Sequence, residues 1–192
     1  MTRLERLYLA AAAVLVASIV TLLVLQAGPL PAAIIGGAMT LALPAWALTS
    51  LRRPPDPARV LPVYVLTCAL LMVHIVEEVA FDFGPRIGEL TGTGWTREEF
   101  TTTIVLLGPV LWITGALAVA RRHPLGGFLA WFVFIGMVLG EPVHLLFPVL
   151  EGGRYAYFPG LWTALLPMVP ALWGIQLLVR DSRAPQLRGP ER

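Results

Sequence analysis

The chain has 192 residues, of which 57% are apolar and 14% charged, and its mean hydropathy is +0.75. A soluble domain carries roughly 25% charged residues. The low charge, together with recurring apolar runs of about 20 residues, excludes a soluble globular protein, a disordered chain and a disulfide-stapled secreted module. The single cysteine, Cys68, lies inside an apolar run, so neither a disulfide framework nor a cysteine-based metal site is available. The composition predicts an integral membrane protein.

Six apolar runs are long enough to cross about 30 Å of hydrocarbon as helices. They cover roughly residues 7–26, 30–50, 60–82, 102–120, 125–149 and 157–179, separated by turn-forming pairs such as Gly28-Pro29 and His123-Pro124. The first run is longer than the apolar region of a signal peptide, so we interpret it as a span. The sequence thus predicts an all-helical, polytopic membrane bundle, with one transmembrane domain over residues 1–180. Residues 181–192 are expected to form a disordered cytoplasmic tail.

The arginines predict how this bundle is oriented, because cytoplasmic loops are enriched in positive charge. If the amino terminus is inside, the outer segments hold only Arg86, Arg97 and Arg154, and the long outer loop covers about 83–101. The inner segments then hold all the others, which are Arg3, Arg6, Arg52, Arg53, Arg59, Arg121, Arg122, Arg180, Arg183, Arg188 and Arg192. Both termini are therefore predicted to be cytoplasmic. The 14 basic residues include no lysine, which hints at GC-rich coding and a bacterial plasma membrane.

Two of the spans carry ionisable side chains, each of which costs about 2.5 to 3.5 kcal/mol inside hydrocarbon. In the third span, His74 is followed at i+3 and i+4 by Glu77 and Glu78, so the three share one helix face. In the fifth span, Glu141 and His144 form an i, i+3 pair. Both groups fall at the same depth in the outer half of the membrane. We expect them to converge on one lipid-accessible pocket between the third, fifth and sixth spans.

A purely structural alternative is a polar clamp that pairs His74 with Glu141 and Glu78 with His144. Polar pairs of this kind contribute only about 0.6 kcal/mol each in membranes. That gain is small compared with the free-energy cost of burying five titratable groups in the membrane. The comparison favours a functional site over a clamp. His123, by contrast, precedes a helix at the cytoplasmic interface and is interpreted as an anchor and turn residue.

The sequence resembles the emopamil-binding protein family, which comprises sterol double-bond isomerases and their EXPERA-domain relatives. The likeness covers roughly 74–181 and rests on five blocks: His74-Ile75-Val76-Glu77-Glu78, Leu107-Gly108-Pro109-Val110-Leu111-Trp112, Arg121-Arg122-His123-Pro124-Leu125, Gly136-Met137-Val138-Leu139-Gly140-Glu141 and Ala171-Leu172-Trp173. The first block also resembles the motif of the bacterial HXXEE membrane family. The resemblance implies a five-helix EXPERA-like core over about 30–180, preceded here by one further helix.

The chain also departs from the isomerase pattern. Phe100 stands where the isomerases have a glutamate, with Glu99 one residue out of register. Pro170 replaces an asparagine, and His144 replaces an aromatic residue.

The resemblance implies catalysis without a metal or other cofactor, by an isomerase or a protonation-initiated cyclase acting on a sterol-like or isoprenoid lipid. In such a reaction an alkene is protonated to a carbocation, and the carbocation then loses an allylic proton. Glu78 is expected to be the principal acid or base and His74 to orient or relay the proton. Glu77, Glu141 and His144 complete the catalytic set, because burial and neighbouring carboxylates help to keep an acid protonated. Trp173, through its π face, and also Trp112 and Glu99 are expected to bind substrate.

Two other classes of function stay open. His-x-x-Glu on one helix and Glu-x-x-His on another are similar to the ligands of di-iron bundles, so a metal-dependent enzyme would use His74, Glu77, Glu141 and His144. A non-catalytic EXPERA-type protein would instead bind a lipid or an amine. The expected partners are a hydrophobic lipid-like molecule and membrane lipids, with no nucleic acid, and a homodimer stays open.

Overall fold

The computed structural model describes residues 1–152 and 155–183, in which all regular structure is helical. Helix boundaries follow local signals: Thr2 and Glu5 form a capping box at the first helix, and Gly28, with φ of 84°, separates the first helix from the second. The elements are α1 (Arg3–Ala27), α2 (Pro29–Thr49), α3 (Pro57–Ala80), α4 (Phe83–Thr91), α5 (Arg97–Ala120), α6 (Pro124–Leu139), the 3₁₀ helix η1 (Glu141–Leu145), α7 (Phe147–Gly152) and α8 (Met168–Arg183).

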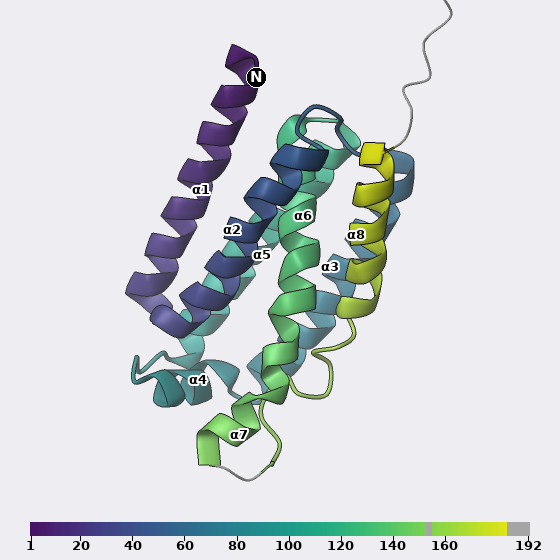
Figure 1. Ribbon diagram of the computed structural model, residues 1–192. Coiled ribbons are helices and arrows are strands. Elements are labelled where there is room, and N and C mark those ends of the chain that lie inside the picture. Colours follow the sequence, from purple (N-terminus) through teal and green to yellow (C-terminus); the bar gives the residue numbers. More distant parts are fainter. Residues whose placement is uncertain (153–154, 184–192) are drawn as a thin grey trace, which may run out of the picture.

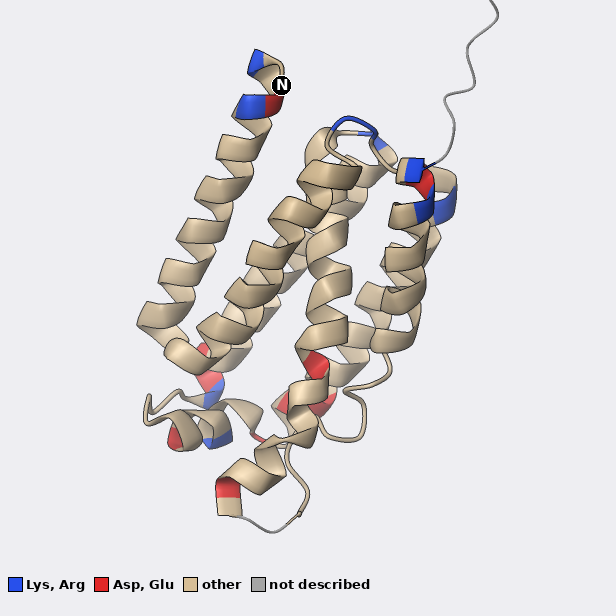
Figure 2. Ribbon diagram, in the orientation of Figure 1, with Lys and Arg blue, Asp and Glu red and all other residues tan. Residues whose placement is uncertain are grey.

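The long helices form one bundle in which successive helices alternate in direction, while α4 and α7 lie at the end away from the amino terminus (Figure 1). Helix α6 packs against α2, α5 and α8, and α8 also packs against α3. Fully buried aromatic side chains, among them Trp46, Tyr64, Phe128 and Phe134, fill the interior between these helices. The amino terminus and the end of α8 lie at the same end of the bundle. Arginine is concentrated at that end, as the sequence predicts (Figure 2).

Five helical segments are long and apolar enough to cross a membrane: Arg3–Ala27, Pro29–Thr49, Pro57–Ala80, Arg97–Ala120 and Pro124–Gly152. These five segments fit an integral membrane protein. They correspond to the first five predicted spans. His123 accepts a hydrogen bond from the Leu125 amide and caps α6, which confirms its expected role at this turn.

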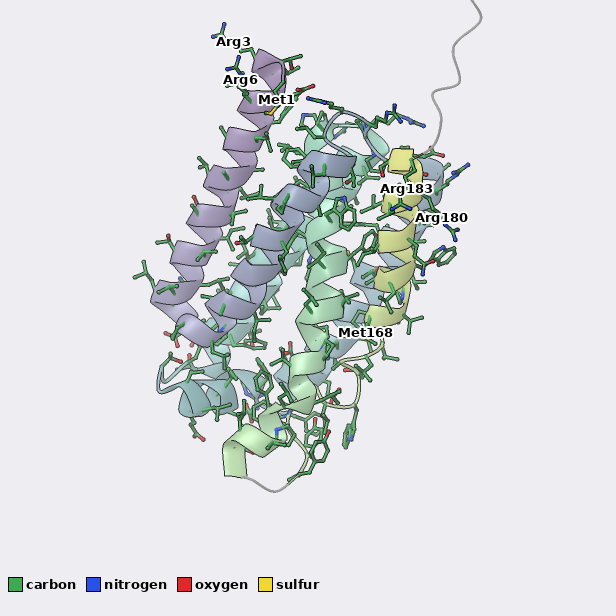
Figure 3. The ribbon with its side chains drawn as sticks, viewed as in Figure 1. Met1, Arg3, Arg6, Met168, Arg180 and Arg183 are labelled. Carbon is green, nitrogen blue, oxygen red and sulfur yellow. The ribbon has the colours of Figure 1, made fainter. Side chains whose placement is uncertain are left out.

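The sixth predicted span, 157–179, differs from the structure. Helix α8 begins only at Met168, partway along the bundle (Figure 3), and its 16 residues span about 24 Å. Residues 155–158 are irregular and residues 159–167 form turns instead of an α-helix. Pro159 and Pro167 have no amide hydrogen to donate, and Gly160 adopts φ of 85°, so a continuous helix cannot form here.

Three smaller differences concern the site end and the carboxyl terminus. The fifth predicted span, 125–149, is broken after Leu139, where the 3₁₀ helix that contains Pro142 follows α6. The predicted outer loop contains α4, which buries Phe83 and Ile87. Residues 181–183 of the predicted tail belong to α8, and the rest of that tail lies outside the described residues.

Candidate functional site

Four ionisable side chains from two segments meet at one point in the bundle. His74 and Glu78 lie one turn apart on α3, and Glu141 and His144 lie on η1. His74 Nε2 is 2.9 Å from Glu141 Oε2 and 3.5 Å from Glu78 Oε1. His144 Nε2 is 3.4 Å from Glu78 Oε1 and 3.9 Å from Glu141 Oε2. These four residues are called the His/Glu centre below, and their meeting confirms the predicted convergence of the two groups.

The break in α6 places two of these side chains. A 3₁₀ helix has three residues per turn, so side chains at i and i+3 lie directly above one another. Glu141 and His144 have this spacing on η1 and therefore both face α3. The edge of one histidine ring meets the face of the other, with the centroids of His74 and His144 4.7 Å apart and the planes at 88°.

Hydrogen bonds on the outer side of each ring fix both histidine tautomers. His144 Nδ1 lies 3.1 Å from the carbonyl oxygen of Pro159, which can only accept, so Nδ1 carries the hydrogen. His74 Nδ1 lies 3.0 Å from Thr163 Oγ1. Thr163 Oγ1 gives its one hydrogen to Glu77 Oε2 at 2.6 Å, so it accepts from His74 Nδ1–H. Both Nε2 atoms therefore face the carboxylates of the centre.

Glu77 lies outside the His/Glu centre, although the sequence groups it there. Its carboxylate accepts from the Tyr157 hydroxyl at 2.8 Å, from the Trp162 amide at 3.2 Å, and from the amide and hydroxyl of Thr163 at 2.9 and 2.6 Å. These contacts direct the Glu77 carboxylate to residues 157–163, and its predicted role as a catalytic group or metal ligand stays a prediction. Consecutive residues on a helix differ by about 100° in direction, and packing against 155–167 turns Glu77 away.

The turn after Pro159 fits closely against both rings. A Cβ added at Gly160 would lie 2.6 Å from His144 Nδ1 and 2.8 Å from His74 Cε1. Gly160 also has φ of 85°, a region that L-residues rarely adopt. Only glycine lets the backbone pass this close to the two histidines.

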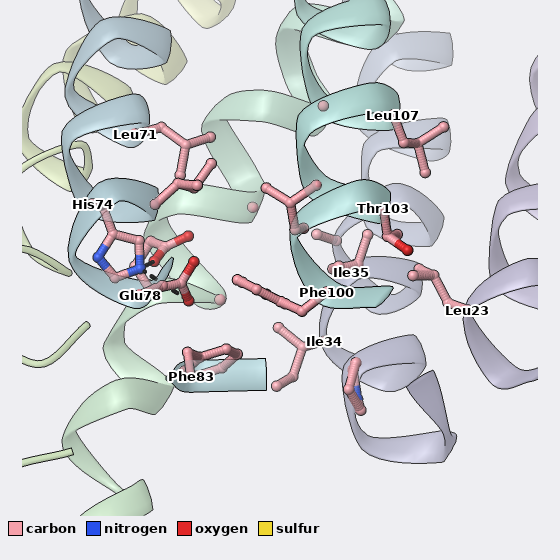
Figure 4. Close-up of a pocket in the computed structure, with 18 of the residues that line it drawn as sticks. Leu23, Ile34, Ile35, Leu71, His74, Glu78, Phe83, Phe100, Thr103 and Leu107 are labelled. Carbon is pink, nitrogen blue, oxygen red and sulfur yellow. Dashed lines mark ion pairs between the residues drawn. The ribbon is translucent and has the colours of Figure 1, made fainter. Parts of the chain in front are cut away.

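A cavity of about 200 Å³ adjoins the His/Glu centre. Its ionisable lining groups are His74, Glu78, Glu141 and His144, and the rest of its wall is almost entirely aliphatic or aromatic. Figure 4 shows His74 and Glu78 at one side of the cavity and aliphatic side chains from α1, α2 and α5 at the other. The site thus offers an apolar binding space that ends at a polar centre.

The three predicted substrate-binding residues have different positions. Trp112 lines the cavity. Trp173 does not line it and is 54% exposed on α8. Glu99 caps the start of α5 by bonding Thr96, while its neighbour Phe100 lines the cavity. The expectation of a pocket bounded by the sixth span is also wrong, because α1, α2 and α5 supply the walls in place of α8.

The predicted site residues do not include Thr163, Pro159 and Gly160, which contact the two histidines. A threonine and a Pro-Gly pair in an apolar run carry no signal that relates them to a helix some 80 residues away in the chain. The one local hint was the Pro-Gly pair itself, which favours a break inside the predicted sixth span.

Comparison of the chain with protein-family models, with curated proteins and with solved structures finds no match in any of the three.

Proposed function

We propose that the protein is a membrane-embedded enzyme that acts on an apolar, isoprenoid- or sterol-like lipid at the His/Glu centre. The observation that carries this proposal is the cavity, whose apolar walls end at four largely buried ionisable side chains. An apolar wall selects a hydrocarbon substrate, and the polar centre supplies reactive groups at one position along it.

The residues themselves support a proton-transfer reaction, namely isomerisation or protonation-initiated cyclisation through a carbocation. Glu78 lies within 3.5 Å of both Nε2 atoms, so it can exchange a proton with either histidine. Glu141 pairs with His74 and can accept the second proton. Trp112 on the cavity wall offers a π face to a cation, the role that the sequence suggested for Trp173.

The proposed enzyme has six spans, with both termini cytoplasmic and the His/Glu centre in the outer half of a bacterial plasma membrane. The concentration of arginine at the end that holds both termini supports this orientation (Figure 2). The turns of 155–167 and α8 together would form the sixth crossing. Helix α8 packs against α3 and α6, and the turn before it bonds to α3 through Thr163 and Glu77.

The substrate class is tested by mass spectrometry of lipids that co-purify with the protein in detergent. We expect a polycyclic or isoprenoid lipid in the wild type and its loss in Gly136→Leu, which fills the cavity. Gly37→Leu is the matched control, because Gly37 is on α2 outside the cavity lining and an added Cβ there meets nothing within 4 Å. Equal lipid content in the wild type and Gly136→Leu would contradict the proposal.

The proton-transfer form is tested by incubating the protein and the identified lipid in D₂O. Protonation of an alkene carbon introduces deuterium at that carbon, and Glu78→Gln should abolish this exchange. Glu89→Gln, an exposed glutamate on α4, should leave it unchanged. Bound lipid without exchange or conversion would instead make the protein a lipid-binding protein.

A metal-dependent enzyme is the second candidate. The Nε2 atoms of His74 and His144 face the carboxylates of Glu78 and Glu141, and both kinds of group are metal ligands.

A further inference from the structure

We propose that His74, Glu78, Glu141 and His144 bind one divalent transition-metal ion. The inference rests on the proposed function because it uses the same site, and it develops the second candidate, the metal-dependent enzyme. It replaces the ligand set expected from sequence, because Glu78 takes the place of Glu77.

The spacing of the four potential ligand atoms supports this assignment. A tetrahedral ion with bonds of about 2.1 Å holds its ligand atoms roughly 3.4 Å apart. The four distances between a histidine Nε2 and a carboxylate oxygen of the centre are 2.9, 3.4, 3.5 and 3.9 Å. One atom from each of His74, Glu78 and His144 also lies within 4.8 Å of the others. These three atoms could share one ion, and Glu141, whose Oε2 lies 2.9 Å from His74 Nε2, would complete the set once its side chain turns toward them.

The outer hydrogen bonds of the rings have the pattern found around metal-binding histidines. Such residues typically donate the ring hydrogen that faces away from the metal to a carbonyl or a carboxylate. His144 donates to the carbonyl of Pro159. His74 donates to Thr163, which passes the interaction on to the Glu77 carboxylate. With Nδ1 as the donor, each ring in its neutral form presents the lone pair of Nε2 to the centre.

Two atoms inside the centre have no hydrogen bond among the described residues: His74 Nε2 and Glu141 Oε2. They lie 2.9 Å apart, at ion-pair distance, but neither has a hydrogen-bond partner. His74 is only 1% exposed, so water does not satisfy its nitrogen from the bulk. Buried polar atoms without partners are costly, and bonds from both atoms to a cation would satisfy them.

The donor types restrict the ion. Imidazole nitrogen suits zinc, iron and other transition metals, whereas calcium and magnesium prefer sites built from oxygen. Two nitrogens and two carboxylate oxygens, without a thiolate, fit Zn²⁺, Fe²⁺ or Mn²⁺ best. Because all four residues also line the cavity, a bound ion would be accessible to a molecule held there.

The test uses the full-length protein purified in detergent, with metal content measured by elemental mass spectrometry. Chelator-treated protein is also titrated with Co²⁺, whose visible absorption is strong in tetrahedral sites. We expect about one Zn, Fe or Mn ion per wild-type chain and one equivalent of absorbing Co²⁺. His74→Ala and His144→Ala should retain less than about a tenth of that. The matched control is His123→Ala, which removes the remaining histidine, the cap of α6, and should bind like the wild type.

A fourth variant tests the site without removing a ligand. Thr163→Val breaks the hydrogen bond to His74 Nδ1 and should weaken Co²⁺ affinity about 10- to 100-fold, whereas Thr163→Ser should restore it. A wild-type protein that retains no metal and gives no Co²⁺ absorption overturns the proposal. So does metal binding that is unaffected in both His74→Ala and His144→Ala. Lipid content is measured on the same samples, so metal-free protein with bound lipid rejects the metal site alone, and metal without lipid rejects the substrate class alone.

Discussion

Thr163 Oγ1 lies 3.0 Å from His74 Nδ1, and this contact joins the turn before α8 to the face of α3 that carries His74 and Glu78. The same hydroxyl donates to Glu77, so the orientation of His74 depends on residues that do not touch the cavity. Glu77, Tyr157 and Thr163 are therefore positioning residues, and the histidine they position belongs to the His/Glu centre.

Glu77→Gln is expected to destabilise the protein. The Gln side-chain NH₂ would face hydrogen-bond donors, leaving buried groups unpaired at a cost of about 1–3 kcal/mol. Thermal or denaturant unfolding in detergent measures the change in the free energy of unfolding. Glu98→Gln, an exposed glutamate at the start of α5, is the control and should be near neutral. Equal stability of the two variants would show that the Glu77 network carries no net stabilisation.

Gly160→Ala is expected to disrupt the His/Glu centre more than it disrupts the fold. The new methyl group would lie against both imidazole rings, so at least one ring must move. Gly94→Ala is a control for backbone strain alone, because Gly94 also has positive φ, of 65°, but an added Cβ meets nothing within 4 Å. Both variants should lose stability by roughly 1 kcal/mol or more. Only Gly160→Ala should also lose lipid conversion or metal, and equal losses of function would argue against a tight fit at the histidines.

Glu78→Gln and His144→Ala should impair the same activity and should not act independently. Glu78 Oε1 and His144 Nε2 are 3.4 Å apart, and residues in direct contact couple by about 0.5–3 kcal/mol. The double variant should therefore be little worse than the more damaging single variant in lipid conversion or Co²⁺ binding. Additive losses in this double-mutant cycle would mean that the two residues serve separate sites.

The ion pair between Asp82 and Arg97 predicts a pH effect at the start of α4. Their side chains lie 2.5 Å apart, and the hydrogen bond from Arg97 holds the pKa of Asp82 below its ordinary value. A lowered folded-state pKa gives stability that is complete above the unfolded pKa of about 3.9 and is lost as pH falls through the folded value. The effect should be small, because both side chains are about half exposed.

The melting temperature of the wild type should accordingly fall more between about pH 5 and pH 3 than that of Asp82→Asn. Asparagine tolerates the left-handed backbone that Asp82 adopts, with φ of 62°, so this variant removes the charge without straining the turn. Parallel pH profiles for the two proteins would show that the pair does not contribute.

Local rules account for much of the fold. Apolar runs, prolines and capping residues predict the five long helical segments, and the arginines predict which ends of those helices lie together. Spacing also predicts that His74 and Glu78 share a face, as do Glu141 and His144. These predictions succeed because hydrophobic periodicity and backbone hydrogen bonding act within a single helix. Residues that are near in sequence are there also near in space.

Tertiary packing decided the rest. Which of Glu77 and Glu78 enters the centre depends on the turn that lies beside α3, and only the folded chain brings Thr163 and Gly160 there. The exclusion of Trp173 from the cavity likewise follows from how α8 is placed against α3 and α6. A sequence fixes the direction of a side chain about its own helix axis, but the rotation of one helix against another comes from the packing of all of them together.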